Sequence, residues 1–256
     1  MVVKKTPWLI MHEPRHEARI RLFCFPYAGG GAGLYRRWAS EMPEYIEVVA
    51  VEPPGRQTRF SEPPVRDLTE MIDALIDATD ALLHKPYATF GYSLGSIVSI
   101  EFVRAALQRK MPPPLHMFCS AHRAPHIKPR RDLIHTLPEH ELVRRLVEMG
   151  GTPIELVTQP EWLRPFLNAI RADLRIAGSY RASLPFTLPV RLSVFGGKDD
   201  SEVEFASLRA WETYSEGPFK LRLVEGGHFF LHTAATEVMA YILADLSWVH
   251  ATFGQD

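Results

Sequence analysis

Six short runs of β-branched, aromatic and other apolar residues recur along the chain, and helical patterns separate most of them. The runs are RIRLFCF at 19–25, IEVVAV at 46–51, YATFGY at 87–92, LHMFCS at 115–120, VRLSVF at 190–195 and KLRLVE at 220–225. The clearest helical pattern covers Asp67–Leu83, with Asp67 and Glu70 as a capping pair at its N-terminus. Alternating strands and helices are typical of a mostly parallel sheet flanked by helices, with ligand sites at the carboxyl ends of the strands. The sequence therefore predicts an α/β fold.

The alternation fails between the fourth and fifth runs, where no convincing strand occurs. Two T-x-x-E signatures in this interval, Thr136–Glu139 and Thr158–Glu161, predict the N-termini of amphipathic helices. We interpret the interval as a helical lid that lies over the sheet. The expected units are a core of residues 1–124 and 186–256 and an inserted lid of residues 125–185.

The charge balance argues against partners that require a basic surface. Lys and Arg total 29 against 30 for Asp and Glu, so no net positive field is available for duplex nucleic acid or an anionic membrane. Cys24 and Cys119 lie inside apolar runs, as buried thiols in a reducing compartment do. The longest stretch without Asp, Glu, Lys or Arg, Pro86–Ile100, has 15 residues, fewer than the ~18–20 that cross a bilayer. The N-terminus lacks the apolar run of a signal peptide, and we expect a cytoplasmic protein.

A G-x-S-x-G pattern, Gly91-Tyr92-Ser93-Leu94-Gly95, stands between the third predicted strand and a predicted helix. In that context the pattern forms a sharp strand-to-helix turn, which exposes the serine hydroxyl above the sheet. The helix N-terminus then faces the negative charge that develops when the serine attacks an acyl group. Ser93 is therefore the candidate nucleophile, and an ordinary Gly-Ser loop is the alternative.

A nucleophilic serine needs an imidazole base, and the imidazole needs a carboxylate that fixes its tautomer. The strand at 220–225 leads into Gly226-Gly227-His228, which makes His228 the expected base. The strand at 190–195 leads into a G-G-K-D-D turn, in which Asp199 and Asp200 each lie three residues after a glycine. Asp200 is the favoured acid, and Asp199 is the alternative.

The negatively charged oxygen that forms during acyl transfer needs backbone N–H donors. Leu94, directly after the serine, would supply one of them. The second would come from the loop Phe25–Gly31 after the first strand, whose glycines allow it to fold over the serine. Tyr27 is the preferred second donor, and Ala28 is the near alternative.

FCFPYAGGGA, the Pro54-Gly55-Arg56 turn, FGYSLGS, GGKDD and GGHFFL occur in this order and together resemble the type II thioesterases that accompany polyketide and nonribosomal peptide synthetases. The resemblance extends from about residue 19 to residue 246. It implies an α/β-hydrolase fold with a helical lid and with the catalytic triad on Ser93, Asp200 and His228. It also implies hydrolysis of acyl groups from the phosphopantetheine arm of acyl or peptidyl carrier proteins.

Two points of the resemblance leave the substrate open. Similar enzymes release medium-chain fatty acids from the carrier protein of a fatty acid synthase, which is the alternative function. Many relatives have histidine directly before the serine, whereas this chain has Tyr92, which could alter the acyl pocket.

The lid carries two further candidate sites. Its apolar residues Met149, Trp162 and Phe166 would line an acyl chamber, although stripes at helical spacing also serve simple packing. The stretch HRAPHIKPRR at 122–131 has four positive charges and no negative one. It is either a solvated face or a docking surface for acidic carrier proteins, with Lys128, Arg130 and Arg131 as the docking residues.

Two other motifs suggest different chemistry. Gly29–Gly33, with Glu52 at the end of the next strand, is similar to a dinucleotide-binding turn, although Leu34 breaks the G-x-G-x-x-G pattern. A dinucleotide-dependent oxidoreductase is therefore the remote alternative. His12–His16 matches H-E-x-x-H, but Pro14 would disrupt the helix that this zinc motif requires. We expect a monomeric hydrolase that needs no metal or other cofactor.

Overall fold

The computed structural model describes residues 6–128, 133–152, 155–182 and 186–253. These residues form one sheet of seven strands in the order β1-β3-β2-β4-β5-β6-β7, in which only β1 is antiparallel to its neighbour. The strands are β1 Leu9–Ile10, β2 Ile20–Phe25, β3 Ile46–Val51, β4 Tyr87–Tyr92, β5 His116–Ser120, β6 Leu192–Gly197 and β7 Phe219–Val224. The predicted parallel sheet is confirmed, and each predicted strand lies within two residues of its expected bounds.

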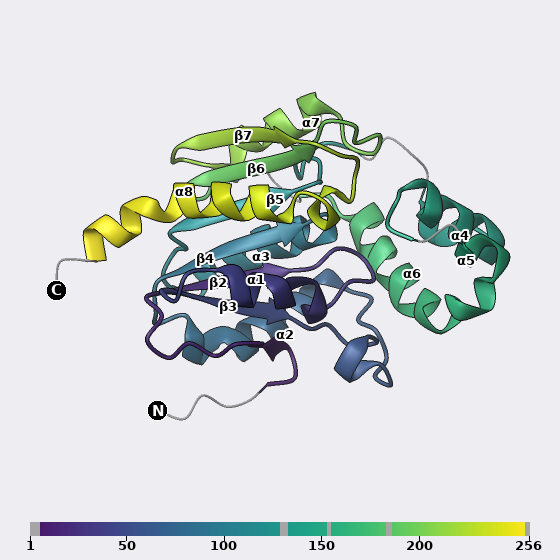
Figure 1. Cartoon of the computed structure of the whole chain (residues 1–256), viewed down its shortest axis with the longest axis horizontal. Helices are drawn as coiled ribbons and strands as arrows, with labels where there is room; N and C mark the ends of the chain where they lie inside the picture. The colour runs from purple at the N-terminus through teal and green to yellow at the C-terminus, as the bar shows by residue number, and fades with distance from the viewer. Residues whose placement is uncertain (1–5, 129–132, 153–154, 183–185, 254–256) are drawn as a thin grey trace.

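Helices cover both faces of this sheet (Figure 1). α1 and α8 pack on one face, and α2 and α3 pack on the other. The helices are α1 Arg36–Glu41, α2 Leu68–Thr79, α3 Leu94–Gln108, α4 Glu139–Glu148, α5 Glu155–Thr158, α6 Arg164–Ser179, α7 Phe205–Arg209 and α8 Ala235–Phe253. Within the described ranges, no helix combines the length and apolarity needed to cross a bilayer.

The central strands β2 to β6 are buried at every position and mostly apolar, because both of their faces are covered. On β2, Phe23 and Phe25 contact the core under α2 and α3, whereas Leu22 and Cys24 contact the core under α1 and α8. A fully buried side chain of this kind stabilises the fold by roughly 1.5–3 kcal/mol. This two-sided burial is why the strands appear in the sequence as continuous apolar runs rather than alternating ones.

The predicted helix caps are correct in the core and wrong in the lid. Asp67 caps α2 and accepts the Glu70 N–H at 3.1 Å, as expected. Thr136 instead ends the 3-10 helix Ile134–Thr136 and donates to the carbonyl of Leu133 at 2.7 Å. Thr158 ends α5 and donates to the carbonyl of Glu155 at 2.8 Å. Both threonine hydroxyls bond within their own turn, an alternative to capping that the T-x-x-E pattern does not exclude.

The interval between β5 and β6 is helical, and its described residues form no strand apart from an isolated bridge between Leu188 and Ser215. Figure 1 shows α4, α5 and α6 grouped together at one end of the sheet. α4 and the N-terminal part of α6 share a small apolar core of their own, made of Leu142, Val143, Leu146, Leu163 and Leu167. We call these helices and the segments that join them, within the described residues of 125–185, the lid.

Candidate active site

Ser93 lies in a strained turn between β4 and α3. Its φ of 52° and ψ of −113° lie outside the regions that side chains normally adopt, and the flanking glycines leave no room for a Cβ. A Cβ on Gly91 would lie 2.2 Å from the Gly95 carbonyl oxygen, and one on Gly95 would lie 2.0 Å from that of Phe25. The close approach of β2 to this turn therefore depends on Gly95, and the turn holds the serine hydroxyl at the carboxyl end of the sheet.

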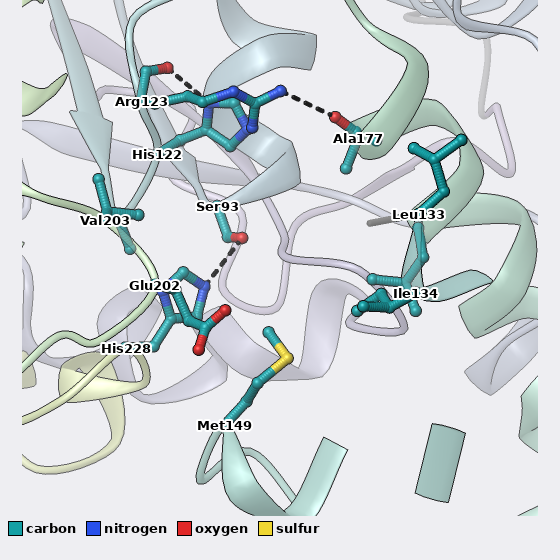
Figure 2. Close-up of a pocket in the computed structure, with 13 residues that line it drawn as sticks. Ser93, His122, Arg123, Leu133, Ile134, Met149, Ala177, Glu202, Val203 and His228 are labelled. Atoms are coloured by element: carbon teal, nitrogen blue, oxygen red, sulfur yellow. Dashed lines mark hydrogen bonds between the residues drawn. The ribbon is translucent and has the colours of Figure 1, made fainter. Parts of the chain in front are cut away.

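Ser93, His228 and Asp200 form a continuous hydrogen-bonded chain. His228 Nε2 lies 3.2 Å from Ser93 Oγ, and His228 Nδ1 lies 3.0 Å from Asp200 Oδ2. Figure 2 shows the serine hydroxyl pointing toward the imidazole. Serine and histidine are within reach for a proton transfer, and the carboxylate is placed to hold Nδ1 in its protonated tautomer.

The two candidate acids differ in what they contact. The Asp200 side chain is fully buried, and its Oδ1 accepts the N–H groups of Glu202 at 2.8 Å and Val203 at 3.2 Å. These two donors leave Oδ2 for His228. Asp199 is exposed, and its backbone N–H bonds the carbonyl of Gly226. Of the two aspartates, Asp200 is the one that contacts the imidazole.

Tyr92 supports the turn that carries the histidine. Its hydroxyl donates to the His228 carbonyl at 2.6 Å and accepts the Leu231 N–H at 3.3 Å. The side chain is fully buried, and burial raises the pKa of Tyr92 well above its usual range. Tyr92 is not among the residues that line the cavity over Ser93, so the departure from histidine at this position acts on the histidine turn.

The loop after β2 lies beside the start of α3, where Tyr27 and Leu94 line one small cavity. Because Leu94 is the first residue of α3, its N–H has no acceptor within the helix. Tyr27 and Ala28 are the first two residues of a tight turn, which the Gly30 N–H closes on the Tyr27 carbonyl at 2.8 Å. The Tyr27 ring packs edge-on against Phe229 at 5.1 Å, and its hydroxyl bonds His232 at 3.3 Å. Ring and turn together fix the loop beside the serine.

A cavity of about 150 Å³ opens over Ser93 and His228 and is lined on its other side by lid residues, among them Leu174 and Ala177 of α6. Met149 lines it, as predicted from the sequence. Trp162 and Phe166 do not, because they are 63% and 45% exposed and point outward. The Phe166 ring packs against Phe60 at a centroid distance of 5.5 Å. The buried face of α6 is instead formed by Leu167, Ala169, Ala172, Asp173 and Ile176.

Two residues of the basic stretch, His122 and Arg123, also line the cavity, which the charge pattern did not predict. Arg123 donates to the carbonyls of Ile127 at 2.8 Å and Ala177 at 3.4 Å, and the second of these bonds is drawn in Figure 2. Burial, followed by the Arg123 charge, lowers the pKa of His122 to about 3, so His122 is neutral. The two residues lie two and three positions after the end of β5, and this place at the carboxyl end of a strand is the signal that would have identified them.

The basic stretch 122–131 is therefore only partly a surface. His122 is buried and Arg123 half-buried against the cavity, whereas Lys128 is exposed. Arg130 and Arg131 lie outside the described residues. Of the three expected docking residues, Lys128 is the one whose exposure the structure describes.

The glycine-rich turn does not fit a dinucleotide. Glu52 is fully buried, and its carboxylate accepts the N–H groups of Ala32 at 2.6 Å and Thr58 at 3.2 Å. The Gly33 N–H is bonded to the Gln57 side chain at 2.9 Å. The backbone N–H groups that would bind a pyrophosphate therefore bind side chains of this protein instead. Glu52 is one of these partners, so its carboxylate is not available to bind a ribose.

A parallel sheet with a strained serine turn after β4, and with an aspartate and a histidine after β6 and β7, defines an α/β-hydrolase. Within that class the chain belongs to the thioesterase domain family, whose model matches residues 20–246. The family resemblance predicted from the motifs is confirmed.

Several individual proteins are similar to this chain over most of its length. The linear gramicidin dehydrogenase LgrE of Brevibacillus parabrevis is 36% identical over 95% of this chain and 94% of its own length. The gramicidin S biosynthesis protein GrsT of Aneurinibacillus migulanus is 32% identical over 95% of each chain. Among solved structures, the type II thioesterase BorB from the borrelidin biosynthetic cluster matches with a TM-score of 0.86 at 32% identity, over 93% of this chain and 97% of that one.

Proposed function

We propose that this protein is an editing, type II thioesterase, which hydrolyses acyl groups from the phosphopantetheine arm of carrier proteins in polyketide or nonribosomal peptide biosynthesis. Membership of the thioesterase family and similarity to type II enzymes of such pathways support this substrate class. The observation that carries the chemistry is the hydrogen-bonded chain Ser93–His228–Asp200, whose serine and histidine line a cavity together with lid residues.

The proposed reaction is acyl transfer in two halves. Ser93 Oγ attacks the thioester carbonyl while His228 Nε2 takes its proton, and Asp200 stabilises the imidazolium. The N–H groups of Leu94 and Tyr27, with Ala28 as the alternative to Tyr27, stabilise the oxyanion. The thiol leaves with the proton from His228, and water then repeats the attack on the acyl-serine to release the carboxylic acid. Water is the only co-reactant, so phosphopantetheine takes part only as a portion of the substrate.

The cavity size favours short acyl groups. A cavity of about 150 Å³ is as large as an engineered protein cavity that binds benzene, so it has room for a short acyl group. Met149 and Ile134 from the lid line this cavity and would supply apolar surface to a bound acyl group (Figure 2).

The proposed partner is an acidic carrier protein, which approaches the basic stretch where Lys128 is exposed. We expect the Lys128→Glu, Arg130→Glu, Arg131→Glu triple variant to raise KM for acyl-carrier substrates and to leave small thioesters nearly unaffected. Raising the salt from 0.1 to 1 M shortens the Debye length from about 10 to about 3 Å, so it should reproduce the effect in the wild type. Equal effects on both substrate types would refute the docking role without affecting the triad.

We further propose that the enzyme acts as a monomer in the cytoplasm. All of the proposed catalytic groups come from one chain. Cys24 and Cys119 are buried free thiols, which supports a reducing compartment.

The experiment that tests this function is a hydrolysis panel with acyl groups from acetyl to dodecanoyl, loaded on a carrier domain of a peptide or polyketide synthetase and on a fatty acid synthase carrier. Ser93→Ala is the control. We expect release of free thiol and short carboxylic acids from the synthetase carrier. Preference for decanoyl and dodecanoyl on the fatty acid synthase carrier would instead support the medium-chain alternative. Absence of hydrolysis on every substrate would refute the proposal.

A further inference from the structure

We propose that Asp173 on lid helix α6, together with Arg56, positions the oxyanion loop over Ser93, so that α6 forms part of the catalytic framework. The inference rests on the proposed function, because it assigns a role to groups that hold the Tyr27 loop. Asp173 and Arg56 are positioning residues: neither lines the cavity that opens over Ser93.

The Asp173 carboxylate connects the lid to the oxyanion loop directly. Its Oδ2 accepts the Gly29 N–H at 2.7 Å, and the same oxygen accepts a hydrogen bond from the Arg56 guanidinium. Gly29 lies two residues after Tyr27 and has a φ of +82°, a conformation that few residues other than glycine adopt. A carboxylate that binds this N–H fixes the backbone of the loop close to the proposed donor.

Arg56 connects the same carboxylate to a second turn. It belongs to the Pro54-Gly55-Arg56 motif, to which the mechanism assigns no role, and its guanidinium also donates to the Pro54 carbonyl. Its Nε has no hydrogen-bond partner among the described residues. Burying the Arg56 guanidinium with one N–H group unpaired costs free energy, and the nearby negative charge of Asp173 offsets that cost.

One face of α6 packs against both turns. A Cβ on Gly29 would lie 2.8 Å from Ile170 Cγ1, and a Cβ on Gly55 would lie 3.3 Å from the Ala169 side chain. Ala169, Ile170 and Asp173 are neighbours on the helix surface, so one helix face contacts both glycine turns and carries the ion pair.

The ion pair lies directly behind the proposed oxyanion donors. Tyr27, Leu94, Arg56 and Asp173 line one small cavity of about 10 Å³, large enough for about a single water molecule. Both charged side chains are at least 95% buried. A shift of the carboxylate would therefore be transmitted to the loop rather than absorbed by solvent, and a displacement of about 1 Å is enough to cost roughly 10²-fold in rate.

The test compares Asp173→Asn with a matched control. Glu47→Gln is suitable because Glu47 is also buried and also binds one backbone N–H, that of Arg15 at 3.0 Å, and one arginine, Arg21 at 2.8 Å. It lies at the amino end of β3, at the opposite end of the parallel strands from Ser93. Asp173→Asn keeps the side-chain shape but removes the charge. Arg56→Lys, which keeps the charge but not the fork of donors, is the second variant if Asp173→Asn folds poorly.

The readouts are kcat and KM for an acyl-N-acetylcysteamine thioester, the affinity for an alkylboronic acid, and amide hydrogen exchange of residues 27–31. A tetrahedral boronate on Ser93 places an oxygen in the oxyanion hole, so its affinity reports the hole separately from substrate binding. We expect Asp173→Asn to lower kcat and boronate affinity by about 10- to 100-fold with KM within about threefold, and to speed exchange in the loop. Glu47→Gln should lower the melting temperature comparably and leave kcat within about twofold.

An Asp173→Asn enzyme with wild-type kcat and wild-type loop exchange would overturn the proposal, as would equal loss of kcat in both variants. If the wild type itself does not hydrolyse thioesters, the proposed function fails, whereas loop exchange still decides whether Asp173 holds residues 27–31.

Discussion

Replacing Asp200 by asparagine is expected to abolish most of the activity, because it would stabilise the wrong tautomer of His228. The hydrogen bonds around Asp200 explain why. Oδ1 accepts two backbone N–H groups, from Glu202 and Val203, so the amide oxygen of an asparagine must take that position. The amide NH2 then occupies the position of Oδ2, 3.0 Å from His228 Nδ1. It would donate to Nδ1 and leave the proton on Nε2, where the imidazole cannot accept one from Ser93.

The wrong tautomer costs about 10⁴-fold in kcat when the same exchange is made in a serine protease triad, which corresponds to about 5.4 kcal/mol of transition-state stabilisation. We expect a loss of this size for Asp200→Asn. The melting temperature should change little, because the two backbone bonds of the turn remain. Asp199→Asn, at the exposed neighbouring position, should leave kcat within about twofold.

The assay is steady-state hydrolysis of an acyl-N-acetylcysteamine thioester by both variants, with circular dichroism as the control for folding. Retention of a tenth of the wild-type kcat by Asp200→Asn would refute the tautomer argument. A larger loss in Asp199→Asn than in Asp200→Asn would transfer the role of acid to Asp199.

Three further predictions concern the elements that support the site. Tyr92→Phe leaves the carbonyl of His228 without its buried donor, so we expect a loss of about 1–3 kcal/mol in the free energy of unfolding, measured by denaturant titration, and a lower kcat. Gly95→Ala would place a Cβ 2.0 Å from the end of β2, and hydrolysis assays on the folded fraction should show at least about a 10²-fold loss; wild-type kcat would contradict the packing described here. Burial lowers the pKa of His116 to about 4 and that of His122 to about 3, so the unfolded chain binds more protons than the folded one below about pH 6.5. The free energy of unfolding should therefore fall by up to about 1.4 kcal/mol per pH unit for each histidine as the pH drops toward 4, and a His116→Gln variant with an unchanged slope would contradict this.

The sequence was sufficient for the core because its physical signals are local. Strands buried on both faces leave continuous apolar runs, and the Asp67–Glu70 pair leaves a cap signature. The serine turn is also local, because its strain and its close contacts both require glycine at fixed positions on either side of Ser93.

The lid and the support of the oxyanion loop depend on contacts that no local pattern encodes. Trp162 and Phe166 fit an apolar stripe, yet the face of α6 that is buried includes the charged residue Asp173. The partners of Asp173 lie 117 and 144 positions away, at Arg56 and Gly29. A buried ion pair between such distant residues becomes visible only when the fold brings them together.

The most direct test of the central claim is covalent labelling of Ser93. The enzyme is titrated with a fluorophosphonate while thioester hydrolysis is followed, and the modified peptide is identified by mass spectrometry. We predict one adduct per chain, on Ser93, with hydrolysis lost in proportion to labelling and with neither labelling nor hydrolysis in Ser93→Ala. Labelling at another residue, or hydrolysis that persists in the fully labelled enzyme, would contradict the assignment of Ser93 as the nucleophile.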